Sequence, residues 1–289
     1  MAMSGVFVRI VRSALLTLPL TARRCLFVLT THRRLPNLRN PQRFTDKVHW
    51  RILNDRRDVL ARTCDKLGMK EIARDAGGTS VRIPETVWSG TDLRELGDVA
   101  LPDRWVLKPT HRFGRIIFGS GRPDIADLQE RTAGWLDEIN WAVHGEWAYG
   151  QAVRQFLVEE RIGESEQVPA DYKFFVFDGV AQFVLVVADR FNGGGSNAAY
   201  YDRDWNRIAV HPGGENMPLH ERPDNLTDLL DVAGRIGEAF DFMRVDLYSV
   251  DGEVWFGETT PYPVSGMATY SPDDFDFQMG GFWTLPKLG

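Results

Sequence analysis

Residues 243–260, MRVDLYSVDGEVWFGETT, decide the fold class. Apolar and polar side chains alternate on both sides of an Asp-Gly pair, which is the pattern of two antiparallel strands joined by a tight turn. A two-residue turn would put Asp246 and Glu258 on opposite faces of the hairpin. A three-residue loop that ends at Gly252 instead pairs Arg244 with Glu258, and Asp246 then shares their face. We expect this second register, with three charged side chains on one surface.

The shared surface is partly apolar, because Val254 and Phe256 also lie on it. Unpaired carboxylates on such a surface are costly. A hard divalent cation held by Asp246 and Glu258 would remove that cost and leave Arg244 to hold a phosphate or carboxylate oxygen. A plain cross-strand ion pair between Arg244 and Glu258 is an equally good interpretation of the same pattern.

Other strands and helices alternate along the chain without the regular rhythm of a doubly wound sheet. Periodicity and turn residues predict strands over 104–108, 115–118, 155–160, 172–177 and 181–188, and helices over 47–54, 60–76, 124–141 and 226–240. The turn signal Asp178-Gly179 joins two of these strands. This order predicts an α+β fold built from antiparallel hairpins.

Charged residues at or near the ends of apolar strands are further candidates for chemistry. Lys108 precedes a donor-rich loop, residues 110–114, that could fold over phosphates, although a lysine at a strand end also commonly extends to solvent. Lys173 lies among aromatic residues, where an inward position needs an anionic partner and an outward position needs none. Glu159 and Glu160 suit either a hinge whose backbone binds a purine edge or an ordinary solvated strand end.

The composition is that of a folded protein, and its charge is unevenly distributed. The 289 residues are 43% hydrophobic and 26% charged, with a net charge of −6, which excludes disorder and a disulfide scaffold. Residues 1–62 hold thirteen Lys and Arg against three acids, whereas the remainder holds 21 against 37. We expect no nucleic-acid partner for this acidic body. Two cysteines, Cys25 and Cys64, fit a reducing cytoplasm.

The basic N-terminal region contains an apolar segment, residues 6–29. Arginines interrupt it well short of the roughly 20 residues that a membrane span requires. No small-residue cleavage site of a secretory signal follows it. Peripheral contact with the inner face of a membrane is one interpretation, and packing within an N-terminal subdomain is the one we favour.

Rival chemistries find little support. The six histidines show no HExxH or other metal-ligand spacing, and no Gly-x-Ser-x-Gly elbow is present. The stretch GGGS at residues 193–196 is either a mobile lid over a substrate or, more commonly, a plain surface loop.

The order of these signals resembles the ATP-grasp superfamily and, more narrowly, the TupA-like ATP-grasp family, named for teichuronopeptide biosynthesis. The motifs that carry the narrower resemblance are Pro41-x-x-Phe44-Thr45-x-Lys47, Trp50, Asp55-Arg56-Arg57, Asp171-Tyr172-Lys173-Phe174-Phe175, Asp189-Arg190-Phe191, Tyr201-Asp202-x-Asp204-Trp205, Arg244-Val245-Asp246-Leu247-Tyr248 and Tyr262-Pro263-x-Ser265-Gly266. The resemblance runs from about residue 41 to residue 271. Agreement of several multi-residue motifs makes it specific.

The resemblance implies an ATP-grasp fold, in which two α+β subdomains sandwich a nucleotide. We expect a basic helical N-terminal segment over 1–62, one subdomain over 63–154 and the second over 155–289. The implied activity is that of an ATP- and Mg²⁺-dependent ligase that forms an amide from a carboxylate and an amine through an acyl phosphate. The implied substrates are small molecules or peptides, namely amino acid, peptide or uronate-type compounds of cell-surface polymer or secondary-metabolite biosynthesis. A kinase on the same fold and a non-catalytic ATP-binding or membrane-docking protein are the alternatives.

The same resemblance assigns roles to individual residues. Those expected to bind ATP are Lys66, Lys108, His111, Arg112, Glu159, Glu160, Ile162, Glu164 and Lys173, with Glu166 as the alternative to Glu164 at the ribose. Lys66 and Lys108 would hold phosphates, and the backbone over 160–162 would take the adenine. Arg244 and Lys173 are the expected catalytic residues. Asp246 and Glu258 are the expected magnesium ligands.

Two segments depart from the pattern of the resembled family. The loop over 110–114 is THRFG where relatives have a sequence close to NHGSG, so we expect a stiffer loop or an added phosphate contact through Arg112. Pro261 and Val264 stand where relatives often carry Phe and Gly, which alters the expected acceptor pocket.

Overall fold

The computed structural model describes residues 13–138, 140–165, 167–188, 197–210 and 219–288. Its α-helices are α2 (Leu20–His32), α3 (Phe44–Asn54), α4 (Asp58–Arg62), α5 (Lys66–Gly77), α6 (Ile125–Arg131), α7 (Asn140–His144), α8 (Leu226–Gly237) and α9 (Asp274–Phe282). Its strands are β1 (Thr86–Gly90), β2 (Arg104–Pro109), β3 (Ile117–Ser120), β4 (Phe156–Glu160), β5 (Asp171–Phe177), β6 (Val180–Ala188), β7 (Asn197–Asp202), β8 (Arg207–Ile208), β9 (Phe242–Val250) and β10 (Glu253–Thr260). Short 3-10 turns include η3 (Trp147–Gln151) and η4 (Pro263–Gly266).

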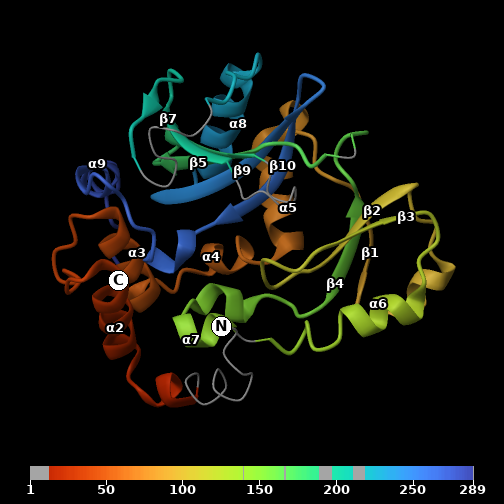
Figure 1. Cartoon of the computed structure of the whole chain (residues 1–289), viewed down its shortest axis with the longest axis horizontal. Helices are drawn as coiled ribbons and strands as arrows, with labels where there is room; N and C mark the ends of the chain where they lie inside the picture. Colours follow the sequence, from red (N-terminus) through yellow and green to blue (C-terminus); the bar gives the residue numbers. More distant parts are fainter. Residues whose placement is uncertain (1–12, 139, 166, 189–196, 211–218, 289) are drawn as a thin grey trace.

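The strands form two antiparallel sheets that lie side by side (Figure 1). One sheet has the order β1-β4-β2-β3, and the other has the order β10-β9-β5-β6-β7-β8. The predicted α+β fold class is therefore confirmed. β4 pairs with β1 and β2, so the first sheet extends beyond the expected subdomain division at 154/155.

Helices cover both faces of the six-stranded sheet. α8 packs against β5, β6 and β9 with its apolar face, and α5 packs beside it against β10. Gly237 permits this approach, since a Cβ there would lie 2.4 Å from the Val176 side chain. On the other face, the Phe44 ring of α3 meets Phe242 edge to face, with 4.9 Å between ring centroids. The main core thus lies around β5 and β9, the strands that also carry the charged residues.

The β9–β10 hairpin forms, but the expected three-residue loop is wrong. The turn consists of Asp251-Gly252, and both residues have positive φ (53° and 77°), as the tight turn that matches strand twist requires. A bulge at Gly257 then shifts the pairing, so that Glu258 lies opposite Asp246. The bulge achieves what the longer loop was expected to do, because Arg244 contacts both carboxylates.

Two helices predicted as continuous are interrupted. The helix expected over 60–76 is divided into α4 and α5, because the Asp65 carboxylate caps α5 by accepting hydrogen bonds from the backbone N–H groups of Leu67 and Gly68. The helix expected over 124–141 ends at Arg131, and Gly134 follows with a positive φ of 75°. The hairpin turn at Asp178-Gly179 is confirmed.

Part of the N-terminal segment packs against the rest of the chain. Arg24 of α2 is buried, and its Nε donates to His49 Nδ1 at 2.9 Å. Within the described ranges, no helix has the length and apolarity needed to cross a membrane. Residues 1–12, Glu166, the motif at 189–191 and the stretch at 193–196 lie outside the described residues.

Candidate nucleotide-binding site

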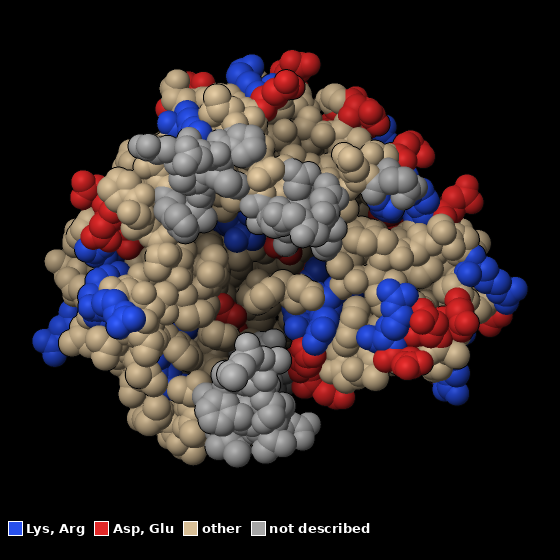
Figure 2. Space-filling view, viewed as in Figure 1, with Lys and Arg blue, Asp and Glu red and all other residues tan. Residues whose placement is uncertain are grey.

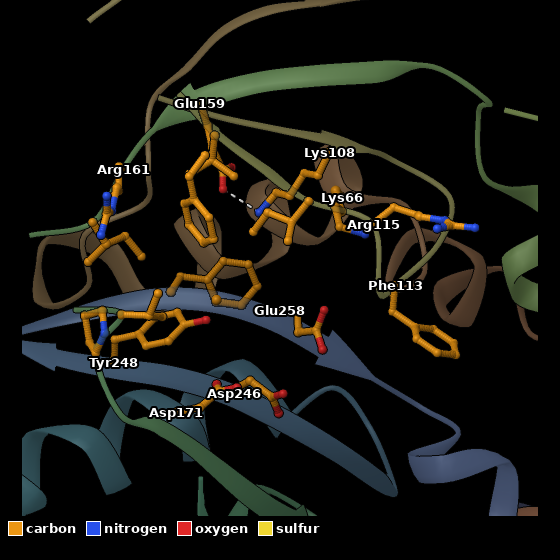
Figure 3. A pocket seen from close by; sticks show the side chains of 18 of the residues that line it. Lys66, Lys108, Phe113, Arg115, Glu159, Arg161, Asp171, Asp246, Tyr248 and Glu258 are labelled. Carbon is orange, nitrogen blue, oxygen red and sulfur yellow. Dashed lines mark ion pairs between the residues drawn. The ribbon is translucent and has the colours of Figure 1, made fainter. Parts of the chain in front are cut away.

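A cavity of about 260 Å³ lies between the two sheets. The space-filling view shows the surface hollowed between the two halves of the molecule, with basic and acidic side chains at the edge (Figure 2). The charged side chains that line the cavity are Lys66, Lys108, Arg112, Arg115, Glu159, Glu160, Arg161, Asp171, Asp246 and Glu258. Figure 3 shows the lysines on the side of the first sheet and the carboxylates of β5, β9 and β10 on the other.

Lys66 occupies the first turn of α5, where Asp65 orients the helix. The Asp65 carboxylate caps α5 and also accepts a hydrogen bond from the backbone N–H of Val153 at 3.1 Å. The Lys66 ammonium donates to the carbonyl oxygen of Arg112, which ties the helix to the loop over 110–114. Burial lowers the pKa of Lys66 to about 8, although Glu258 acts in the opposite direction.

Glu159 of β4, in the first sheet, forms an ion pair with Lys108. One carboxylate oxygen pairs with the Lys108 ammonium, as Figure 3 shows, and the other lies 2.6 Å from the Lys70 ammonium. Lys70 also donates to the carbonyl oxygen of Pro84 and to Thr86 Oγ1. Burial alone would raise the pKa of Glu159, but the two ammonium groups outweigh it and lower the pKa. Glu159 therefore orients a lysine at the cavity wall.

Asp246 is the centre of a buried ionic network on the opposite wall. Arg244 donates to both of its oxygens at 2.7 Å, and Lys173 bridges it to Asp171, with 2.7 Å between Lys173 Nζ and Asp171 Oδ2. Arg244 also reaches Glu258 Oε1 at 3.3 Å. Burial would raise the pKa of Asp246, but Arg244 and Lys173 outweigh it and lower the pKa. Three carboxylates face two cations, so the network carries a net charge of −1.

This donor set fits a magnesium ion that is shared with phosphates. Among the described residues, no group of three or more His, Cys, Asp and Glu side chains is placed to hold a metal by itself. Mg²⁺ usually takes only one or two protein carboxylates and completes its shell with water and substrate phosphates. Asp246 and Glu258 lie opposite each other on neighbouring strands and both line the cavity, which supplies that smaller set.

Predicted purine-side residues lie at the end of the cavity away from Phe113. Glu160 and Ile162 line the cavity, and Figure 3 shows the intervening Arg161 at this end. Glu160 also accepts a hydrogen bond from the backbone N–H of Glu85 at 2.9 Å. Glu164 is exposed and is not among the lining residues, so the structure does not bring it to the cavity.

His111 lies away from the cavity, contrary to its expected place beside the nucleotide. It is 1% exposed and lines a separate, smaller cavity behind the loop. Arg112 lines both cavities, and its guanidinium pairs with Glu138, which also holds Arg115 at 2.6 Å. These ion pairs attach Arg112 and Arg115 to the segment between α6 and α7.

Some residues that line or support the cavity were not predicted from the sequence. For two of them, Lys70 and Asp171, the spacing from a predicted residue could have indicated their position. Lys70 follows Lys66 by one helical turn and therefore shares its side of α5. Asp171 precedes Lys173 by two residues, so the two share one face of β5. Apolar lining comes from Val106, Ile116, Phe118, Val168, Pro169, Tyr248 and Phe256.

Two of the motif segments quoted from the sequence, 171–175 and 244–248, contribute lining residues to this cavity. A family model described as TupA-like ATPgrasp matches residues 46–283. The chain belongs to the TupA-like ATP-grasp family. The family expected from the sequence is thereby confirmed.

One of the quoted motifs of the TupA-like family, Asp55-Arg56-Arg57, stabilises the fold of this chain. Arg57 donates to both Asp55 oxygens and to Asp241, which also accepts from the buried Arg51 at 2.6 Å. Arg51 further donates to the carbonyl oxygen of Phe242 at the start of β9. This network joins α3 to the strand that carries the catalytic candidates.

Solved structures similar to this TupA-like chain include three ligases. D-alanine–D-alanine ligase from Bacillus anthracis, complexed with ATP, has 15% identity and a TM-score of 0.42 over 69% of this chain and 55% of its own. L-amino acid ligase from Bacillus licheniformis has 13% identity and a TM-score of 0.41, and the match covers 80% of this chain and 47% of the ligase. D-alanine–D-alanine ligase from Helicobacter pylori has 13% identity and a TM-score of 0.42, and the match covers 78% of this chain and 61% of the ligase. The matched regions span about half to three fifths of those proteins. No curated protein sequence matches the chain significantly.

Proposed function

We propose that the chain is an ATP- and Mg²⁺-dependent ligase that joins a carboxylate to an amine. The observation that carries this proposal is the convergence of two lysines, Lys66 and Lys108, and two carboxylates, Asp246 and Glu258, on one cavity between the sheets. Membership in the TupA-like ATP-grasp family supports the same conclusion.

The cavity offers each part of ATP a suitable surface. Phe118 and Tyr248 supply apolar area for the adenine near the backbone over 160–162. Lys66 and Lys108 supply cations for the phosphates. Asp246 and Glu258 would hold Mg²⁺, which when bound offsets the negative charge of the phosphates.

Arg244 and Lys173 are the residues that we propose assist the transfer, because both contact the Asp246 carboxylate, which lines the cavity. In the proposed reaction, a substrate carboxylate oxygen attacks the γ-phosphorus, ADP leaves, and an acyl phosphate forms. The amine then attacks the acyl carbon, phosphate leaves, an amide forms, and the amine nitrogen loses one proton. Asp246 holds both cations in place behind the cavity wall, so their positive charge would stabilise the transition state with little reorganisation.

The substrate class that we propose is an amino acid, peptide or uronate-type compound used in cell-surface polymer or secondary-metabolite synthesis. The family name, derived from teichuronopeptide biosynthesis, supports this class. Cys25 and Cys64 are free thiols, which agrees with action in the reducing cytoplasm.

Calorimetric titration of ATP, with and without Mg²⁺, tests the site. A screen of carboxylate and amine pairs for ADP release, with mass analysis of the product, then tests the reaction. An amide product supports the ligase. A phosphorylated hydroxyl without amide would establish the kinase instead, and ATP binding without ADP release from any pair would favour a non-catalytic protein.

A further inference from the structure

Helix α2 reverses the usual distribution of polar and apolar side chains on a surface helix. Arg23 and Arg24 are buried, whereas Leu26 and Leu29 are 38% and 47% exposed. A helix on a protein surface normally turns its apolar side toward the core and its charged side toward water. The outward leucines of α2 therefore call for a partner outside this chain.

Hydrogen bonds of the two arginines fix this orientation of α2. Arg23 Nη1 donates to the carbonyl oxygens of Ala142 and Val143 in α7, at 2.9 and 3.1 Å. Arg24 Nε donates to His49 Nδ1 in α3 at 2.9 Å. Rotation of the helix to bury its leucines would break these bonds and leave buried acceptors unpaired, which is costly. The leucine side of α2 thus stays outward.

The outward residues of α2 form one continuous face. Ala22, Leu26 and Leu29 are exposed and follow one another at spacings of four and three residues, so they share one side of the helix. Arg33 follows at the next such position, and Leu18, just before the helix, is also exposed. Figure 1 shows α2 at the edge of the molecule. We call Ala22, Leu26, Leu29 and Arg33 the outer face of α2.

The charges around the outer face favour an anionic partner. The first 45 residues contain eight arginines and no Asp or Glu, whereas the remaining 244 residues hold 26 Lys and Arg against 40 acids. Arg33 and Arg39 are exposed. In Figure 2 the lower left of the molecule, where Figure 1 shows α2, carries tan and blue atoms and no red ones. Two copies of the chain that met through α2 would oppose like charges, whereas anionic lipid head groups would neutralise them.

We propose that the outer face of α2 docks the protein on the surface of an anionic lipid membrane. The leucines enter the boundary between head groups and acyl chains, and the exposed arginines contact lipid phosphates. The contact is peripheral, because α2 has 13 residues and a membrane span requires roughly 20. The arginine side of the helix packs against the chain, and the leucine side contacts lipid.

Cosedimentation with sucrose-loaded vesicles tests this proposal on the full-length protein. Vesicles of phosphatidylglycerol and phosphatidylcholine in equal parts are the probe, and vesicles of pure phosphatidylcholine are the control. We expect the protein to sediment with the anionic vesicles and to stay in solution with the neutral ones. Added salt should weaken the binding, because it screens the arginines. No nucleotide is present, so the result is independent of the proposed ligase function.

Paired variants locate the apolar part of the contact. Leu26→Ser/Leu29→Ser removes apolar surface at two exposed positions, so we expect it to keep the fold and to weaken vesicle binding about 10-fold or more. Val180→Ser/Leu219→Ser is the matched control, since these side chains are exposed (38% and 69%) outside the N-terminal region. It should bind vesicles like the parent protein.

A second pair of variants tests the charged part. Arg33→Gln should weaken binding to the anionic vesicles about 5-fold, the usual effect of one basic residue near an anionic surface. Arg203→Gln makes the same change at an exposed site between β7 and β8 and should leave the binding unchanged.

Absence of sedimentation with the anionic vesicles would overturn the proposal. Equal sedimentation of the parent protein and Leu26→Ser/Leu29→Ser, or equal sedimentation with neutral vesicles, would also overturn it. Sedimentation velocity without lipid supplies the remaining test. A dimer of the parent protein that Leu26→Ser/Leu29→Ser abolishes would assign the outer face of α2 to a second copy of the chain instead.

Discussion

Glu258 lies opposite Asp246 because a bulge at Gly257 shifts the β9–β10 pairing by one residue. A Cβ on Gly257 would lie 2.9 Å from the Asp246 carbonyl oxygen, so only glycine allows this approach. Without the shift, the two-residue turn at Asp251-Gly252 would place the carboxylates on opposite faces of the sheet. One residue of irregular backbone therefore brings both proposed magnesium ligands to the cavity.

We expect Glu258→Gln to lose much of the Mg²⁺ dependence of ATP binding. The carboxylate is 34% exposed, so its replacement by an amide should leave the unfolding temperature within about 2 °C of the parent. Calorimetry with and without Mg²⁺ checks the first effect, and thermal unfolding checks the second. Glu253→Gln changes an exposed carboxylate on the same strand and is the control. Unchanged turnover at unchanged stability in Glu258→Gln would refute the metal assignment.

Lys108→Ala is expected to weaken ATP binding about 10- to 100-fold, the usual cost of one lost charge-assisted contact. It also removes one of the two cations on Glu159. The double variant Lys108→Ala/Glu159→Gln separates these effects when both proteins are titrated with ATP. Recovery of affinity in the double variant would show that Lys108 serves only to neutralise Glu159.

ATP affinity should fall as the pH rises from 7 to 9. Burial lowers the pKa of Lys66 to about 8, so the ligand-free protein loses the charge that we propose binds phosphate within that range. Loss of one required proton with a pKa near 8 predicts an affinity about 10-fold lower at pH 9 than at pH 7. Lys66→Arg keeps its charge and should show a flat profile. Parallel profiles for the two proteins would exclude Lys66 as the titrating group.

Lys173→Met should destabilise the protein by about 3–5 kcal/mol, because it leaves the buried carboxylates Asp171 and Asp246 with too little positive charge. Adding Asp171→Asn removes one of the two carboxylates and should restore part of the loss. Urea unfolding of the two single variants and the double variant measures this coupling. Strictly additive changes in the free energy of unfolding would show that Lys173 and Asp171 do not interact as the structure indicates.

The sequence alone was sufficient to predict those strands whose signals are local. Period-two alternation and Asp-Gly turns located β5, β6, β9 and β10, since strands expose alternate residues to opposite faces. The predictions of helix ends and of the register between β9 and β10 were less accurate. The cap at Asp65 divided a helix predicted as continuous, and the bulge at Gly257 replaced the expected loop, because each depends on hydrogen bonds that side-chain periodicity does not encode.

Motif order identified the TupA-like ATP-grasp family, and eight of the twelve predicted site residues line the larger cavity, namely Lys66, Lys108, Arg112, Glu159, Glu160, Ile162, Asp246 and Glu258. Only the tertiary structure decided which of these side chains meet. It placed His111 at the smaller cavity instead of the larger one, paired Arg112 with Glu138 and placed Glu159 between Lys70 and Lys108. The physical reason is that buried charges must be neutralised by partners distant in sequence, and packing of the two sheets selects those partners.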